Sequence, residues 1–80
     1  MKILVKFFAS YRETVGNSYE EFDVPVNATI SNVIKTITEK YPKLGTMKEA
    51  LYILNQTVVD VNTKVKESDT LAVFPPVGGG

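Results

Sequence analysis

The carboxyl-terminal segment carries the groups of this chain that are best suited to chemistry. After Asp69 there is no further charged side chain, and residues 70–80 read TLAVFPPVGGG. Pro75 and Pro76 have no amide hydrogen to donate, so they end a strand and hold the chain extended, which lowers the entropy lost on binding. Glycines 78–80 lack a Cβ and can pass through a channel too narrow for other residues. The terminal carboxylate is then the group presented, and it becomes reactive toward sulfur or amine nucleophiles once it is joined to AMP in a mixed anhydride. Glycine content alone is more typical of a frayed terminus or a linker.

Other kinds of chemistry are excluded by composition. The 80 residues include neither Cys nor His, which removes disulfides, thiolate nucleophiles and the side chain that most often titrates near neutral pH. Nine basic residues balance nine acidic ones, so no long-range positive field favours nucleic acid as a partner. No segment approaches the roughly 18 apolar residues of a membrane span. We therefore expect a soluble, cytoplasmic protein with no membrane partner, no bound cofactor and no metal site.

Two groups of polar residues could be mistaken for catalytic ones. Glu20, Glu21 and Asp23 cluster in one segment, but neighbouring strand residues point to opposite faces, and charges are common on solvated edge strands. Ser10 has no histidine to activate it, and it begins the capping-box pattern that ends at Glu13. The sequence thus predicts an edge strand, a helix cap and no catalytic residue.

The first part of the chain reads as strand, short helix and strand. Ile3, Val5 and Phe7 alternate with outward residues, among which Lys2 and Lys6 are expected to provide solubility. A short helix begins at Ser10 and ends near Gly16. Residues 18–24 predict a second, exposed strand whose buried set is Tyr19, Phe22 and Val24.

The clearest helix follows. One apolar face recurs at helical spacing, Thr29 is a suitable N-cap, and Pro42 with Gly45 stops the helix; the face is made by Ile30, Val33, Ile34, Ile37 and Tyr41. Residues 46–49 repeat the capping-box spacing and predict one more turn. Two strands, 51–54 and 58–61, then flank an Asn55-Gln56 hairpin turn, and a last strand covers 70–74.

These elements predict an α+β domain over residues 1–74, a mixed sheet of about five strands packed on one main helix, with a projecting tail at 75–80. If Leu71 and Val73 are buried, Phe74 faces outward, and Phe8 does so in the first strand. Should these two strands lie side by side and parallel, both rings form an exposed docking patch at the base of the tail. Arg12 is the sole arginine, and its guanidinium suits contact with a partner's carboxylate or phosphate, although an ordinary surface role is equally open.

The chain resembles the ubiquitin-like β-grasp sulfur carriers, the MoaD/ThiS family, and among them the small subunits of molybdopterin synthase. The resemblance spans the whole chain. It is carried by Phe7-Phe8-Ala9 with Arg12-Glu13 and Gly16, by Asn55-Gln56-Thr57-Val58-Val59, by Asp69, and by Phe74-Pro75-Pro76-Val77-Gly78-Gly79-Gly80.

The resemblance implies a carrier subunit rather than an enzyme. A ubiquitin-activating-like, MoeB-like enzyme would use ATP to adenylate Gly80, and a sulfur donor would convert it to a thiocarboxylate. Residues Pro75, Pro76, Val77, Gly78 and Gly79 would enter a MoaE-like large subunit, which would hold the catalytic residues and transfer sulfur to cyclic pyranopterin for a molybdenum or tungsten cofactor. Phe8, Val58 and Phe74 would form the apolar docking patch, with Arg12 as a polar contact.

Other uses of the same tail stay open. The Val-Gly-Gly-Gly end also resembles thiamin-pathway carriers, which lack the Phe-Phe-Ala segment and the double proline. Carriers that thiolate tRNA and modifiers that attach to protein lysines share the tail chemistry. A non-covalent β-grasp binding module is the alternative from another class, and it would tolerate an added residue after Gly80.

Overall fold

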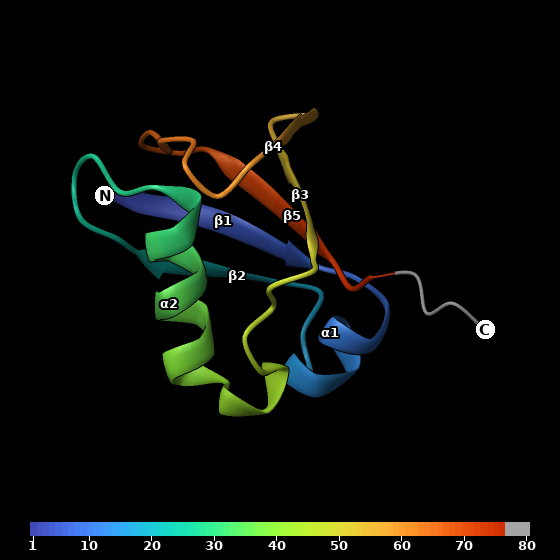
Figure 1. Ribbon diagram of the computed structural model, residues 1–80. Coiled ribbons are helices and arrows are strands. Elements are labelled where there is room, and N and C mark those ends of the chain that lie inside the picture. Colours follow the sequence, from blue (N-terminus) through green and yellow to red (C-terminus); the bar gives the residue numbers. More distant parts are fainter. Residues whose placement is uncertain (77–80) are drawn as a thin grey trace.

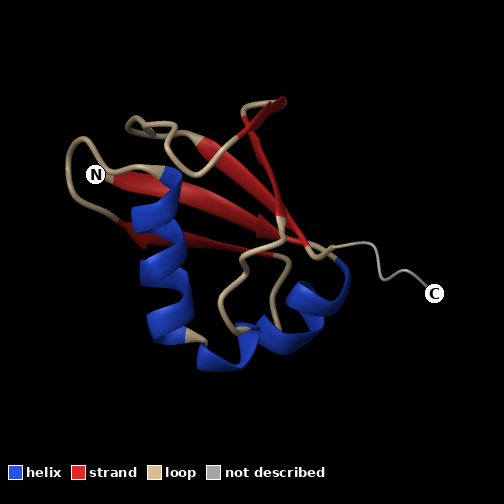
Figure 2. Cartoon of the chain, viewed as in Figure 1, coloured by secondary structure: helices blue, strands red, loops and turns tan. Residues whose placement is uncertain are grey.

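A computed structural model describes residues 1–76, which form a mixed five-stranded sheet with its helices on one face (Figures 1 and 2). The elements in chain order are β1 (Lys2–Phe7), α1 (Ala9–Val15), β2 (Tyr19–Asp23), α2 (Ile30–Lys40), the 3₁₀ helix η1 (Pro42–Leu44), β3 (Leu51–Leu54), β4 (Thr57–Val59) and β5 (Thr70–Phe74). None of the helices within residues 1–76 is long and apolar enough to cross a membrane.

The strand order is β2-β1-β5-β3-β4, with β1 and β5 parallel at the centre. All other neighbouring strands are antiparallel. The parallel pair brings the first and last strands of the chain together, and both run toward the same end of the molecule (Figure 1). The parallel pairing on which the expected contact of Phe8 and Phe74 depends is therefore present, and it places the start of α1 beside the end of β5.

The core lies between the sheet and α2. Ile3, Val5 and Phe7 are buried as predicted, and Leu71 with Val73 is buried beside them. The helix contributes the inner face of its amphipathic pattern, namely Ile30, Val33 and Ile37, each 0% exposed. Burying a side chain of this size contributes about 1.5–3 kcal/mol, so this two-layer core explains how a short chain holds one fold.

The start of α1 differs from the prediction. The helix begins at Ala9 and its N-cap is Phe8, whose carbonyl accepts the Tyr11 and Arg12 amides. Ala9 has a φ of 51°, so the chain turns sharply after β1 and enters the helix earlier than the capping pattern suggests. Ser10 therefore lies inside the first turn and makes no side-chain cap bond. The predicted end is confirmed, since Gly16 adopts the left-handed conformation and its amide donates to the Arg12 carbonyl at 2.8 Å.

The main helix is confirmed, including its cap. The Thr29 hydroxyl accepts the Asn32 amide at 3.3 Å, and the Asn32 side chain accepts the Thr29 amide at 2.9 Å. The turn predicted at 46–49 is present but is not helical: the Ala50 amide donates to the Met47 carbonyl at 3.2 Å, and the Thr46 hydroxyl accepts the Lys48 amide. The short helix forms earlier, at Pro42–Leu44, where proline suits the first helical position.

The strand β2 is an edge strand as predicted, but two of its side chains point the other way. Tyr19 is 63% exposed and lies opposite Lys6 on the outer face, so its predicted burial is wrong. Glu20 points inward with Phe22, its side chain is 17% exposed, and it accepts hydrogen bonds from Lys40 Nζ and the Tyr41 hydroxyl. Burial by itself raises the pKa of Glu20, but these two hydrogen bonds and the charge of Lys40 outweigh burial and lower that pKa. Glu20 thus connects β2 to the end of α2 by hydrogen bonds and is not a solvated charge.

Candidate functional site: an apolar surface at the base of the tail

The rings of Phe8 and Phe74 stack at the end of the central parallel pair. Their centroids are 4.3 Å apart and their planes differ by 11°. Residues on β1 and β5 pair as Lys6 with Ala72 and Phe7 with Val73, so the next residue of each strand carries its ring to the same outer face. The predicted outward placement of the two rings side by side is confirmed, although both rings are half-buried.

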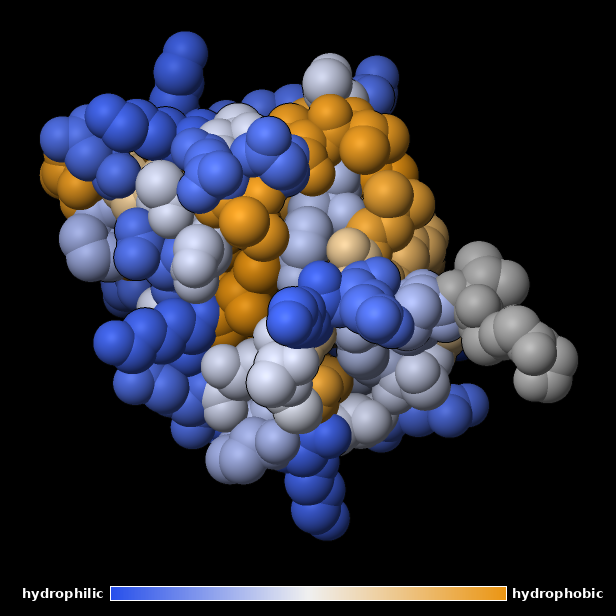
Figure 3. Space-filling view, viewed as in Figure 1, coloured by the Kyte–Doolittle hydropathy of each residue, from blue (hydrophilic) through white to orange (hydrophobic). Residues whose placement is uncertain are grey.

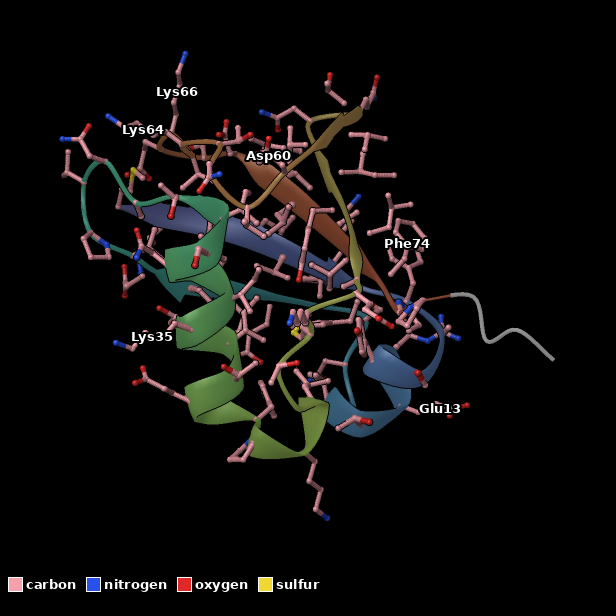
Figure 4. The ribbon with its side chains drawn as sticks, in the orientation of Figure 1. Glu13, Lys35, Asp60, Lys64, Lys66 and Phe74 are labelled. Atoms are coloured by element: carbon pink, nitrogen blue, oxygen red, sulfur yellow. The ribbon has the colours of Figure 1, made fainter. Side chains whose placement is uncertain are left out.

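Two further strands extend this patch. Leu51 lies opposite Phe74 and is 45% exposed, and Val58 on β4 lies opposite Ile53 and is 65% exposed. We call the whole set the apolar surface; it comprises Phe8, Leu51, Ile53, Val58, Ala72 and Phe74. Figure 3 shows apolar side chains gathered over β3 and β4, and Figure 4 shows Phe74 on the flank of the molecule at the end of β5. Val58 therefore shares a face with the two rings, as the resemblance implies, and exposed apolar side chains grouped in this way are typical of a protein-binding surface.

A groove runs along the apolar surface. Its floor and walls are Lys6, Phe8, Ile53, Asn55, Gln56, Thr70, Ala72 and Phe74. Most of the lining is apolar, with an amide-bearing turn at one rim and one ammonium group from β1. Such a groove suits an apolar side chain of a partner, flanked by polar contacts.

A second groove lies against the first residues of the tail. It is lined by Ala9, Ser10, Glu49, Leu51, Phe74, Pro75 and Pro76. The Tyr52 hydroxyl donates to the Met47 carbonyl and so holds the segment that supplies Glu49 to this groove. Burial raises the pKa of Tyr52 to about 12, with a smaller contribution from Tyr11, which extends to more alkaline pH the range in which the hydroxyl can donate this bond.

The remaining predicted site residues lie outside this surface or outside the described residues. Arg12 is exposed on α1, one helical turn beyond Phe8. Pro75 is half-buried and Pro76 is exposed, whereas Val77, Gly78, Gly79 and Gly80 lie outside the described residues. Among residues 1–76, no group of three or more acidic side chains could hold a metal ion.

A hydrogen-bond network fixes the rim of the first groove. Asn55 Nδ2 donates to Asp69 Oδ1 at 2.8 Å, while Asn55 Oδ1 accepts the Thr70 amide at 2.9 Å. The other Asp69 oxygen accepts the Lys66 amide at 2.7 Å. Asn55 and Gln56 both have positive φ, as a tight hairpin turn requires, and the network ties this turn to the start of β5. The predicted turn is confirmed, but its tie to Asp69 was not predicted.

Exchanging the Asn55 and Asp69 side chains is expected to restore the stability that either single substitution removes. Asp69→Asn places two amide donors face to face, and Asn55→Asp places two carboxylates face to face, so each is expected to cost about 1 kcal/mol. In the double variant, the carboxylate at position 55 accepts the Thr70 amide and the side-chain amide at position 69, whose own oxygen accepts the Lys66 amide. Urea unfolding of the four proteins measures the coupling. Additive losses in the double variant would show that the network does not hold the turn.

The order of the strands, the helices on one face of the sheet and the apolar surface beside the last strand define a ubiquitin-like β-grasp protein. The ThiS family matches residues 5–80, and the chain belongs to this family.

Relatives of known description agree with this assignment. The chain is 32% identical over 83 residues to the molybdopterin synthase sulfur carrier subunit of Chlamydomonas reinhardtii, with 100% of both chains covered. It is also 30% identical over 92 residues to small archaeal modifier protein 3 of Haloferax volcanii, again with 100% of both chains covered.

Solved structures share the fold. A putative molybdopterin converting factor subunit 1 from Pyrococcus furiosus superposes with a TM-score of 0.82 at 28% identity, covering 96% of this chain and 99% of that one. A chain of the complex between subunits 1 and 2 of the Helicobacter pylori molybdopterin-converting factor gives a TM-score of 0.54 at 27% identity, with 100% of both chains covered.

Proposed function

We propose that this protein is a sulfur carrier that serves as the small subunit of molybdopterin synthase. The observation that supports this most directly is the Phe8–Phe74 stack, which places exposed apolar side chains where β5 passes into Pro75 and Pro76. A large subunit bound there would receive the tail in its own active site and would supply the catalytic residues. The relative in Chlamydomonas reinhardtii is a carrier subunit of this kind, and the Helicobacter pylori structure is a complex of the two subunits.

The chemistry falls on the carboxylate of Gly80. An activating enzyme joins this carboxylate to the α-phosphate of ATP, and pyrophosphate leaves. Hydrosulfide, or a donor that delivers it, then attacks the acyl carbon; the C–S bond forms, the bond to AMP breaks, and a thiocarboxylate remains. Its sulfur passes to cyclic pyranopterin in the large subunit, and hydrolysis returns the carboxylate. The carrier itself needs no catalytic side chain for these steps.

Removal or extension of the terminus is expected to abolish the reaction. Each variant still ends in a carboxylate, but that group lies one residue short of, or one residue beyond, the position at which the activating enzyme acts on Gly80. We would incubate the protein with ATP, sodium sulfide and an adenylating enzyme of this pathway, and measure its intact mass. The wild type should gain the mass difference between sulfur and oxygen. A variant lacking Gly80 and a variant with one alanine added after Gly80 should show no gain.

The control is a second carrier that the same enzyme is known to activate. If that carrier gains sulfur and the wild-type chain does not, the carrier function is wrong and a non-covalent binding module takes its place.

A second candidate function is attachment to proteins. The 30% identity to a small archaeal modifier protein favours it, and an acyl adenylate reacts with lysine amines as well as with sulfur nucleophiles. Incubating the thiocarboxylated protein with the large subunit and cyclic pyranopterin distinguishes the two. Formation of molybdopterin supports the synthase. Its absence, together with isopeptide-linked products when the unmodified protein is incubated with ATP, the adenylating enzyme and lysine-bearing proteins, supports the modifier.

A further inference from the structure

We propose that Lys6 binds a carboxylate side chain of the large synthase subunit, next to the apolar residues that dock there. This inference rests on the proposed function and extends it from an apolar surface to a specific charged contact. It concerns the one charged side chain that lines the first groove.

The position of Lys6 places its ammonium group inside the area that a partner would cover. Lys6 lies on the outer face of β1, two residues before Phe8, and its cross-strand neighbour on β5 is Ala72. Both neighbours belong to the apolar surface, and all three line the same groove. A partner that packs on Phe8 and Phe74 would therefore remove water from around Lys6.

The strand β1 carries a second lysine, Lys2, which has an acidic cross-strand neighbour that Lys6 lacks. Lys2 occupies the same face, and its cross-strand partner on β2 is Asp23, with which it forms a salt bridge at 3.5 Å. The residue at the equivalent place opposite Lys6 is Tyr19, which has no carboxylate. Among the residues that the structure describes, Lys6 makes no ion pair.

The other acidic side chains on this side of the sheet accept other hydrogen bonds or lie opposite other residues. Glu21 lies opposite Leu4, one step along the ladder. Both oxygens of Asp69 accept hydrogen bonds, from Asn55 and from the Lys66 amide. In the structure, no carboxylate of residues 1–76 forms an ion pair with Lys6.

Covering an unpaired ammonium group is costly, and a carboxylate on the partner removes the cost. A charge that is desolvated without an opposite charge weakens binding strongly, whereas a complementary pair fixes the orientation and speeds association. Apolar docking residues around a lone lysine therefore fit a partner surface that is apolar at its centre and carries Asp or Glu beside it.

The test compares two lysines of the same strand and face. We would measure the Kd of the large synthase subunit from the same organism by isothermal titration calorimetry, at low and at high salt. Lys6→Ala is expected to weaken binding about 10-fold at low salt, and Lys6→Glu more, while Lys2→Ala and Lys2→Glu leave the Kd within about twofold. The wild-type affinity should also fall more steeply with salt than that of Lys6→Ala.

The outcomes separate this inference from the function on which it rests. If Phe74→Ala weakens binding but Lys6→Ala does not, or if the lysine variants at positions 2 and 6 behave alike, the Lys6 contact is wrong and the docking surface stands. If the wild-type chain does not bind the large subunit at all, both the docking function and the contact are overturned. Melting curves of all variants exclude unfolding as the cause, because both lysines are exposed.

Discussion

Phe74→Ala is expected to weaken binding of the large synthase subunit by about 2 kcal/mol, or roughly 30-fold in Kd. The truncation removes the ring that joins the two grooves, since Phe74 lines both of them. It also leaves the Phe8 ring without its stacking partner, which now lies 4.3 Å away between centroids. Aromatic side chains at the centre of an interface commonly carry most of the binding energy, and Phe74 lies between Leu51 and Phe8 on the apolar surface.

Two controls make this measurement specific. Phe74→Leu keeps an apolar side chain of similar reach and should recover most of the affinity. Val26→Ala removes apolar volume from a residue that is 75% exposed in the loop between β2 and α2, far from the end of β5 (Figure 1), and should leave the Kd unchanged. Equal affinities for wild type and Phe74→Ala, with both proteins folded, would exclude the stack as the docking site.

The sequence predicted the outward direction of the two rings because a strand alternates with a period of two. Once Leu71 and Val73 are assigned to the core, Phe74 must face away from it, and the same holds for Phe8 after Phe7. The contact between the two rings could not be predicted from alternation alone, since it depends on pairing between the first and last strands. Nothing local in either strand fixes that pairing, and the structure supplies it.

Leu51 and Ile53 show why part of the apolar surface was missed. In the run Leu51–Leu54 every side chain is apolar or aromatic, so the alternation is visible only after one set has been assigned to the core. Tyr52 and Leu54 take the inner face, and the Tyr52 hydroxyl finds an acceptor there in the Met47 carbonyl. That acceptor comes from a turn, and residue spacing alone does not place it near the strand.

The errors on β2 have a related cause. A segment with three acidic residues reads as solvated, and its aromatic residues read as the buried ones. In the structure Glu20 turns inward because Lys40 and Tyr41, at the far end of α2, provide both of its hydrogen bonds. Tyr19 must then face outward, opposite Lys6. Because Phe22 is buried, the period of two also requires Glu20 to point inward and Tyr19 outward, so the predicted burial of Tyr19 together with Phe22 did not follow strand alternation.

The second large effect expected is on stability, and it distinguishes two adjacent phenylalanines. Phe7 is 1% exposed, and its ring packs edge-on against Phe22 and Tyr41, at 6.4 and 6.5 Å between centroids. Phe7→Ala is expected to cost about 3–5 kcal/mol, because it removes a fully buried ring and leaves a cavity. A chain of this length has only about 4–12 kcal/mol of stability in total, so the variant should lose a large share of its free energy of unfolding.

Phe8→Ala is the matched control, because the same substitution one residue later falls on the opposite face of β1. It loses the stack with Phe74 but leaves the core intact, and the Phe8 cap of α1 is retained since it uses the backbone carbonyl. We expect it to stay folded, with a stability loss of about 1 kcal/mol, and to lose affinity for the large subunit as Phe74→Ala does. Circular dichroism during urea unfolding gives the first quantity and calorimetric titration the second. Equal destabilisation by the two variants would contradict the assignment of Phe7 to the core and Phe8 to the docking surface. If the assignment holds, one phenylalanine serves folding and its neighbour serves partner binding.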